Sequence, residues 1–428
     1  MTTHVDALVI GLGVAGQDVA HRLRSGGLSV VAVERRLIGG ECPNWACVPT
    51  KMMVRAGNAL AEAHRVNRLA GRATTDPDWS PVARRISEAT HGWDDATLDK
   101  ELTAAGIRVV RGAARVTGPG AVRVDREDFT VERAIVLATG TEPAVPEIDG
   151  LAGVPYWTNR DVAELTAPPE SVVILGGGPV GVEFAQILRR FGAVVTLVEM
   201  AERLVAAEDE ESSAFLRSVL ESDGVEVRTG VRATRVRHDG DFRVTLDDGA
   251  TMTGAHLLVA TGRRPNLPGL GFDEIEVDDR LRVSDGIWAI GDITGKGPFT
   301  HVATYQAKIA AADILGRPHR PADYRAVPRC VFVDPEFGAV GLTREQARER
   351  GIRIRTGRAE IPESARGFIH HVGNEGFVRL IADADRDILV GATSAGPAGG
   401  EVLGLLTLAV SAQVPLDELR DMIYAYPT

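Results

Sequence analysis

Two stretches of this sequence repeat one pattern, and together they restrict the fold more than any other feature. In each stretch a short apolar run is followed by a glycine-rich turn, a helical segment and a second apolar run that ends in glutamate. The first copy runs from Val5 to Glu34 and the second from Ser171 to Glu199. Apolar runs that alternate with a helical segment predict βαβ units with parallel strands. The sequence therefore predicts an α/β protein with two Rossmann-like, three-layer domains.

The turn of each copy has the G-x-G-x-x-G spacing of a phosphate-binding turn. Its first glycine permits a tight turn, its second lets the backbone approach a pyrophosphate, and its third lets the helix pack closely on the strand. The N-terminus of the helix that follows attracts the anion. Two dinucleotides are therefore expected on one chain, in contact with Gly11, Gly13 and Gly16 in the first copy and Gly176, Gly178 and Gly181 in the second.

Each copy closes with a carboxylate at the same distance from its first glycine. The spacing is 23 residues from position 11 to position 34 and again from position 176 to position 199. A carboxylate there can accept hydrogen bonds from a ribose. Glu199 favours a free 2′-hydroxyl, because a 2′-phosphate is bound by arginine instead. We therefore expect NADH in preference to NADPH, although Arg203 lies close by in the sequence.

Two of the three cysteines, Cys42 and Cys47, lie five positions apart after the first copy. Five residues of regular α-helix rise about 7.5 Å, whereas a disulfide spans Cα atoms up to roughly 7 Å apart. A bonded pair would therefore require a bent or over-wound backbone, and a strained disulfide is reduced more readily. This indicates a working, redox-active disulfide. The third cysteine, Cys330, lies in an apolar strand pattern and is interpreted as a buried structural thiol.

The composition limits the partners and the location. A net charge of −11 argues against nucleic acid and anionic membranes, both of which select for clustered Lys and Arg. No apolar run reaches the roughly 18 residues of a membrane span, and the start of the chain lacks signal-peptide features. Three cysteines in 428 residues fit a reducing cytoplasm. The ten histidines show no metal-ligand spacing, so no metal site is expected.

The cysteine stretch carries a longer motif, which reads Gly39-Gly40-Glu41-Cys42, then Asn44, Cys47 and Pro49-Thr50-Lys51. With Gly262-Arg263-Arg264-Pro265-Asn266 and Ala289-Ile290-Gly291-Asp292, it resembles the class I pyridine nucleotide–disulfide oxidoreductases. That family includes dihydrolipoamide dehydrogenases, glutathione reductases and mercuric reductases. The resemblance covers nearly the whole chain in order.

The resemblance implies the cofactors and the domain organisation. FAD would bind the first copy, in a discontinuous domain of residues 1–148 and 267–318, and NAD(P)H would bind the second, in residues 149–266. Residues 319–428 would form an α+β dimerisation domain. The family is homodimeric, and the C-terminus of the partner completes the active site.

The resemblance also implies the roles of individual residues. Cys47 would face the flavin, and Cys42 would meet the outside substrate. Lys51 and Glu183 would form a charged pair beside the flavin. Asp292 would contact the ribityl chain of the flavin, and further cofactor contacts are expected at Lys51, Ala113, Thr139, Gly140, Gly262 and Thr300.

One residue departs from the family pattern. Tyr426 stands in Ala425-Tyr426-Pro427-Thr428 where disulfide reductases of the family carry a catalytic histidine before Pro-Thr. Histidine titrates near pH 6.5 and phenol near pH 10, so Tyr426 can donate a hydrogen bond at neutral pH but is a poor base. The mercuric reductases of the family also carry tyrosine there.

Three functions remain open at this stage. The first is passage of electrons from NAD(P)H through FAD and a Cys42–Cys47 disulfide to a dithiol/disulfide substrate of the dihydrolipoamide type. The second is reduction of a small-molecule acceptor that does not need the histidine, such as a quinone, a metal ion or another electrophile. The third is an interaction subunit of a multienzyme complex, which would not need two intact nucleotide turns.

Overall fold

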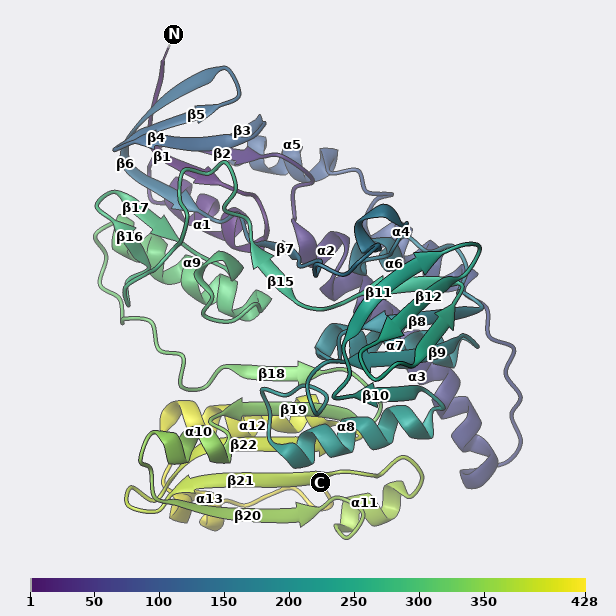
Figure 1. Cartoon of the computed structure of the whole chain (residues 1–428). Helices are drawn as coiled ribbons and strands as arrows, with labels where there is room; N and C mark the ends of the chain where they lie inside the picture. Colours follow the sequence, from purple (N-terminus) through teal and green to yellow (C-terminus); the bar gives the residue numbers. More distant parts are fainter. Residues whose placement is uncertain (1) are drawn as a thin grey trace. The chain divides into compact units, whose positions relative to one another are not determined.

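The structure, a computed structural model, describes residues 2–428 and divides into two compact units (Figure 1). Each unit is built from three segments of the chain. The segments are Met1–Pro49, Arg85–Pro143 and Arg263–Tyr324 in the first unit, and Thr50–Arg84, Ala144–Gly262 and Arg325–Thr428 in the second. The three-domain division expected from the sequence stays a prediction.

An eight-stranded sheet forms the centre of the first unit. Strands β17, β6, β1, β2 and β3 are parallel neighbours in that order, β16 pairs antiparallel with β17, and the β4–β5 hairpin extends from β6. The bounds are β1 Thr3–Ile10, β2 Val30–Glu34, β3 Ile107–Arg111, β4 Ala114–Gly118, β5 Ala121–Val124, β6 Glu127–Leu137, β16 Arg282–Ser284 and β17 Ile287–Ala289.

Alternate residues of the parallel strands point to opposite faces of this sheet, so both faces are apolar. Val9 and Val136 face a core that includes α1 (Val14–Ser25) and α9 (Thr300–Ile314), while Leu8 faces a second core with the hairpin. Strands that are buried on both faces read as continuous apolar runs, which is why the sequence predicted them.

The second copy of the motif forms a four-stranded parallel sheet in the second unit, in the order β10-β9-β8-β14. A three-stranded antiparallel sheet, β11-β12-β13, packs its apolar residues against one face. The elements of this region are β8 Ser171–Leu175, α7 Pro179–Arg190, β9 Val194–Glu199, α8 Glu210–Ser222, β10 Glu226–Thr229, β11 Ala233–His238, β12 Phe242–Leu246, β13 Thr251–Gly254 and β14 His256–Val259.

The C-terminal part of the second unit is a five-stranded antiparallel sheet in the order β18-β19-β22-β21-β20, with α12 (Gly399–Ala412) packed on it. The strands are β18 Pro328–Val331, β19 Glu336–Gly341, β20 Ile354–Glu360, β21 Phe377–Asp383 and β22 Ile388–Gly396. Sequence patterns predict strands at residues 329–333, 376–381 and 388–392, where β18, β21 and β22 lie, but they predict neither β19 nor β20. Strand β20 is an edge strand with mostly exposed residues, so it carries no apolar pattern.

The other elements connect these sheets. The two-stranded β7–β15 pair belongs to the first unit, and α3 begins in the first unit and continues in the second. The bounds are α2 Glu41–Asn44, α3 Cys47–Leu69, α4 Ser80–Ala89, α5 Ala96–Ala104, β7 Thr141–Pro143, α6 Asn159–Ala163, β15 Arg263–Pro265, α10 Arg344–Glu349, α11 Ala365–His370 and α13 Leu416–Asp421.

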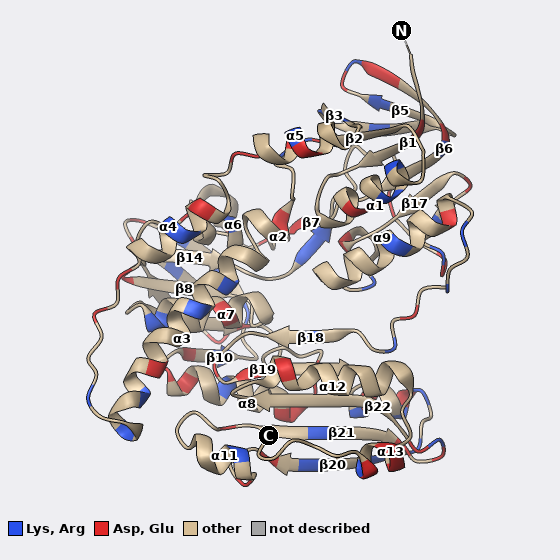
Figure 2. Cartoon of the chain, turned by 180° about the vertical axis from the view of Figure 1, so that it is seen from behind, with Lys and Arg blue, Asp and Glu red and all other residues tan. Residues whose placement is uncertain are grey.

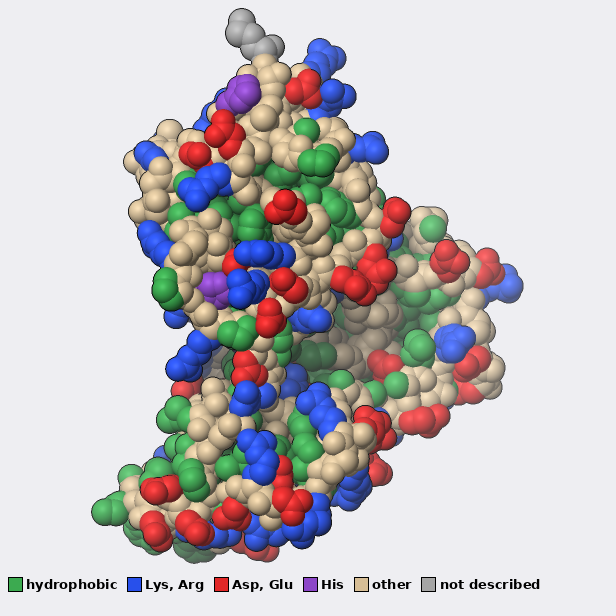
Figure 3. Space-filling model, turned by 90° about the vertical axis from the view of Figure 1, so that its left-hand side faces the viewer, with side chains coloured by type: hydrophobic (Ala, Val, Ile, Leu, Met, Phe, Trp, Pro, Cys, Tyr) green, Lys and Arg blue, Asp and Glu red, His purple; other side chains and the backbone are tan. Residues whose placement is uncertain are grey.

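Charged residues of both signs are spread along the chain (Figure 2) and are mixed over the face shown in Figure 3. No helix within residues 2–428 combines the length and the apolar character that a bilayer crossing requires.

The third glycine of each turn is fixed by close packing in the same way. A Cβ added to Gly16 would lie 1.9 Å from the carbonyl oxygen of Gly11, and a Cβ added to Gly181 would lie 1.9 Å from that of Gly176. The first glycines have φ near +100° and lie against the carbonyls of Ala138 and Ala260 in the two Ala-Thr-Gly segments. Each turn can therefore hold its helix on the sheet only with glycine at these positions.

We expect Gly181→Ala to lower the melting temperature, because the added methyl group would push α7 away from the turn that precedes it. Overpacking of this kind costs about 1–3 kcal/mol or more. Gly178→Ala is the matched control, since a Cβ there has no neighbour within 4 Å. Thermal unfolding of the two FAD-loaded variants measures the difference, and equal melting temperatures would contradict the packing argument.

Candidate active site

Both glycine-rich turns have the form of a phosphate cradle. Helix α1 begins after Gly13 and α7 after Gly178, and neither glycine supplies a side-chain cap to the free N–H groups of its helix. An added Cβ would meet little at Gly13 and nothing at Gly178, so the backbone is open to a ligand at the second glycine of each turn. The residues therefore fit a pyrophosphate at each helix N-terminus.

The terminal carboxylates close the two turns with matching hydrogen bonds. Glu34 accepts from the N–H of Leu12 at 2.8 Å through Oε2 and from the N–H of Arg36 at 2.8 Å through Oε1. Glu199 accepts from Gly177 at 2.5 Å and from Ala201 at 2.7 Å in the same way. A carboxylate has about four lone-pair sites, so each remains able to accept from a ribose hydroxyl.

Arg203, which the sequence left as a possible ligand for a 2′-phosphate, is already engaged. Its Nη1 donates to the carbonyl oxygen of Glu208 and, at 3.3 Å, to the hydroxyl of Ser213. The guanidinium therefore contacts the start of α8.

The helix that would join Cys42 to Cys47 is broken. Cys42 lies in α2, which ends at Asn44; Trp45 is non-helical, and Cys47 is the first residue of α3. This is the bend that the five-residue spacing predicted. Both residues are thiols in this structure, with Cys42 half-buried and Cys47 exposed.

The two thiols share their surroundings with Thr300, the first residue of α9. The Thr300 hydroxyl lies 3.6 Å from Cys47 Sγ. The pKa of Cys42 is raised far above its ordinary value, first by its hydrogen bond with Cys47 and then by burial. The charge of Asp292 raises it further, whereas a hydrogen bond with Thr300 opposes the shift. Within the pair, Cys42 therefore holds its proton strongly.

Asp292 belongs to a chain of polar contacts that leads to the cysteine helix. It accepts at 3.0 Å from the Thr141 hydroxyl, which itself accepts from Arg263 Nε at 2.7 Å. Arg263 also lies 3.5 Å from Glu41, the residue before Cys42. Burial is the first cause that raises the pKa of Asp292. Sequence reasoning assigned no role to Thr141, Arg263 or Glu41, although all three are in or beside the quoted motifs.

Lys51 and Glu183 form an ion pair in the second unit, as the sequence predicted. Lys51 Nζ lies 2.5 Å from Glu183 Oε2, and Oε1 accepts from the backbone N–H of Phe332 at 2.9 Å. The ammonium also lies 4.7 Å from the centre of the Phe332 ring. Glu183 is buried, whereas Lys51 is half-buried. Sequence reasoning missed the contact of Phe332 with this pair, because Phe332 belongs to the distant C-terminal part of the chain.

The remaining predicted residues occupy different settings. Three hydrogen bonds join Thr139 and Gly140 to Asn266. Gly262 has φ of +122°, and a Cβ added there would meet no neighbouring atom within 4 Å. Ala113 lies between β3 and β4 and donates its N–H to Asp125. Tyr426 is 85% exposed.

Cys330 is half-buried, and burial is the first cause that raises its pKa to about 11. Its thiol is therefore protonated at neutral pH. The structural role of this thiol stays a prediction.

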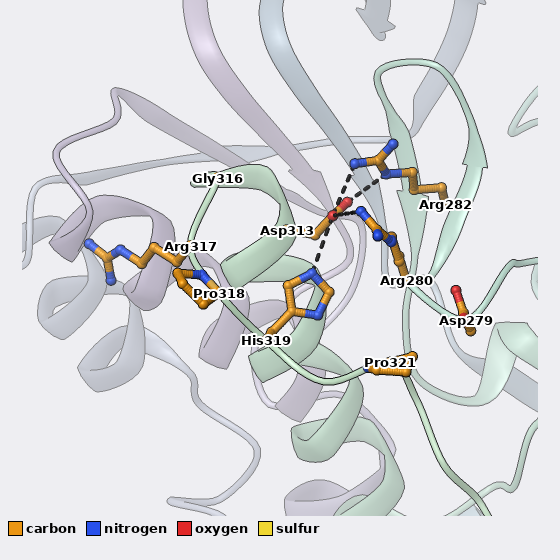
Figure 4. Close-up of a pocket in the computed structure, with 9 residues that line it drawn as sticks. All are labelled: Asp279, Arg280, Arg282, Asp313, Gly316, Arg317, Pro318, His319 and Pro321. Atoms are coloured by element: carbon orange, nitrogen blue, oxygen red, sulfur yellow. Dashed lines mark hydrogen bonds and ion pairs between the residues drawn. The ribbon is translucent and has the colours of Figure 1, made fainter.

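A separate polar pocket of about 520 Å³ lies at the C-terminal end of α9 (Figure 4). Asp313 is its centre and accepts from Arg282 at 2.6 and 2.9 Å, from Trp288 at 2.9 Å and from His319 at 3.3 Å. These contacts lower the pKa of Asp313 although burial opposes the shift. Cations at a helix C-terminus also stabilise the helix dipole, so the cluster has a structural explanation.

Comparison with known families decides the assignment of the chain. The family model described as pyridine nucleotide-disulphide oxidoreductase matches residues 5–307, and the dimerisation domain of the same family matches residues 327–428. The chain belongs to the pyridine nucleotide-disulphide oxidoreductases. The family is FAD- and NAD(P)H-dependent, so the chain is a flavin-dependent oxidoreductase, and the two cradles fit its two dinucleotides.

Two relatives of this oxidoreductase match along nearly their whole length. It is 34% identical to a mercuric reductase of Streptomyces lividans, covering 100% of this chain and 94% of that one. It is 32% identical to a dihydrolipoyl dehydrogenase of Thermus scotoductus, covering 99% and 94%. Among solved structures, the HOCl-induced flavoprotein disulfide reductase RclA from Escherichia coli has a TM-score of 0.86 at 28% identity, covering 99% and 97%. A Cu(II) complex of RclA has a TM-score of 0.87 at 27% identity, covering 100% and 97%.

The raised pKa of Cys42 gives a pH prediction for the reduced enzyme. At pH values below the pKa of a thiol, its thiolate fraction grows about tenfold per pH unit. The rate at which iodoacetamide alkylates Cys42 should therefore still be rising above about pH 8.5, the ordinary pKa of cysteine. Fragment mass spectra that distinguish alkylation at Cys42 from alkylation at Cys47, which lies five residues away, measure Cys42 alone. Asp292→Asn should speed the reaction at any one pH, because the Asp292 charge helps to raise the pKa. A rate that levels off near neutral pH would contradict the assignment.

Proposed function

We propose that this oxidoreductase takes two electrons from NADH and passes them through FAD and the Cys42–Cys47 pair to a small thiol-reactive acceptor. The observation that carries the proposal is the broken helix, which brings the two thiols into contact beside Thr300 and Asp292. When bound, the nicotinamide would supply a hydride to FAD, and the reduced flavin would supply two electrons to the disulfide. The two electrons and one proton carried by the hydride convert one Cys42–Cys47 disulfide into one thiolate and one thiol.

The residues of the chain have distinct parts in this proposal. Glu34 and Glu199 hold the riboses, and the glycine turns hold the pyrophosphates. Lys51, paired with Glu183, supplies a cation next to Cys47 on α3, since the two residues are one helical turn apart. Cys47 faces the flavin as a thiolate, while Cys42 keeps a proton because its pKa is raised.

The acceptor is inferred from how Cys42 loses that proton. Attack on a disulfide needs a thiolate and then an acid for the leaving sulfur, and general acid–base help contributes about 10²–10⁴ in rate. Tyr426 is a poor base at neutral pH. A soft metal ion does not need such a base, because metal binding itself displaces the thiol proton. The raised pKa of Cys42 and the tyrosine therefore favour a metal ion or another electrophile.

Two similarities agree with this choice. The mercuric reductase of S. lividans is 34% identical over the full chain, and RclA has a structure with Cu(II). Quinones and other small electrophiles belong to the same class of acceptor, because they also react without the histidine.

A disulfide of the dihydrolipoamide type is the second candidate. It is favoured by the similarity to the dihydrolipoyl dehydrogenase of T. scotoductus, at 32% identity over nearly the whole chain. It would require Tyr426 or solvent to handle the proton.

We further propose that the enzyme is a homodimer in the cytoplasm. The match to the dimerisation domain supports the dimer. Apolar side chains are also exposed there, on one helix and on the segment after the last helix: Val402, Leu405 and Leu408 of α12, and Met422, Ile423 and Tyr424. A second copy would remove these side chains from water.

The acceptor class is tested by steady-state turnover with NADH. We expect wild-type enzyme to reduce Cu(II), Hg(II) or menadione with a kcat/KM at least tenfold above that for lipoamide. Tyr426→His should raise lipoamide turnover by about 10²-fold, the lower range of general acid–base help. Tyr424→His, two residues earlier, is the control for a histidine introduced into the same segment; it should not raise lipoamide turnover.

Lipoamide turnover in wild type that exceeds turnover of all three other acceptors would contradict the proposed acceptor class and favour the second candidate.

A further inference from the structure

The loop between β9 and α8, residues 200–209, lies against the second phosphate turn. Leu204 is buried, and its Cδ2 lies 2.6 Å from where a Cβ of Gly177 would be. The N–H of Val205 donates to the carbonyl oxygen of Gly177 at 2.9 Å. The loop also begins directly after Glu199, which binds Gly177 and Ala201. A shift of this loop would therefore change the wall of the coenzyme site.

The first half of the loop holds its one arginine, Arg203. Arg203 donates to the carbonyl oxygen of Glu208 and to the hydroxyl of Ser213. As long as the backbone of Glu208 stays in place, these two hydrogen bonds hold Arg203 at the start of α8. Released from Glu208, the same guanidinium would be a ligand for a 2′-phosphate, since arginine binds phosphate with its planar fork.

Glu208 is held in turn by a residue from the C-terminal sheet. Its carboxylate is buried, at 6% exposure, and Arg329 of β18 donates to it through Nε at 2.5 Å and Nη2 at 3.0 Å. The third nitrogen of Arg329 donates to the carbonyl oxygens of Val327 and Gly341. All three guanidinium nitrogens are used, so the geometry of the pair is fixed. A buried carboxylate without its cation is strongly unfavourable, so Glu208 would leave this position if Arg329 were removed.

The acids that follow Glu208 are bound by arginines of α10, β20 and β21. Asp209 contacts Arg344 and Arg379, and Glu211 contacts Arg358 and Arg379. These contacts fix the start of α8 by themselves. Loss of Arg329 alone would therefore free the loop without detaching α8.

We propose that Arg329 is a positioning residue for coenzyme preference. It holds Glu208, Glu208 holds Arg203, and Arg203 is thereby kept from the position where a 2′-phosphate would bind. Discrimination against NADPH then rests on two features, the Glu199 carboxylate and the sequestered Arg203. This inference rests on the proposed use of NADH.

The test is anaerobic flavin reduction by NADH and by NADPH, followed in the FAD-loaded enzyme, so that the acceptor plays no part. Arg329→Ala should lower the ratio of the two rate constants, NADH over NADPH, by at least tenfold, with an absolute gain for NADPH. Arg203→Ala should change the ratio less than twofold in wild type but restore it in the Arg329→Ala background. Arg344→Ala, which leaves the Glu208 pair intact, should keep the wild-type ratio.

Glu208 supplies an independent pair of variants in case Arg329→Ala does not retain FAD. Glu208→Ala should lower the ratio as Arg329→Ala does, whereas Glu208→Gln, which can still accept from Arg329, should keep it within about twofold. The inference is overturned if Arg329→Ala or Glu208→Ala leaves the ratio within twofold of wild type, or if Arg203→Ala fails to restore it. A wild-type preference for NADPH would instead refute the proposed coenzyme, which the wild-type rates report separately.

Discussion

A break of two residues in one helix is the feature on which the candidate site depends. Trp45 and Ala46 separate α2 from α3, and the break lets Cys42 and Cys47 meet although five positions separate them. The backbone accepts the break because both N–H groups bond to the Glu41 carbonyl. Arg263 lies near the Glu41 carboxylate, so the polar chain through Thr141 to Asp292 begins at the same turn.

The two thiols differ in their surroundings and in how strongly a proton is held, and this difference matches the proposed direction of electron flow. Hydrogen bonding and burial keep the proton on Cys42, while Cys47 lies next to the Thr300 hydroxyl at the start of α9. A proton that is held strongly on Cys42 makes the exchange step difficult without a base. The tyrosine at position 426 and the raised pKa of Cys42 both support the proposed acceptor class, which reacts without the histidine.

Local patterns made much of this predictable from the sequence. The βαβ units follow from glycine positions that no other residue can occupy, such as Gly16 and Gly181, and from strands buried on both faces. The sequence predicts a helix from Met52 to about Val66, but α3 already begins at Cys47, because the first turn of a helix tolerates Pro49. Contacts between distant segments were not predictable. The contact of Phe332 with Glu183 and the contact of Arg329 with Glu208 each join positions more than 100 residues apart. No local sequence pattern indicates either contact.

The most direct test of the central claim is the absorption spectrum during anaerobic titration with NADH. A thiolate in contact with oxidised flavin gives a broad long-wavelength charge-transfer band. The account predicts this band in the wild-type enzyme and in Cys330→Ala, and its loss in Cys47→Ala. A band that persists without Cys47, or a wild-type enzyme that shows none, would contradict a redox-active Cys42–Cys47 pair.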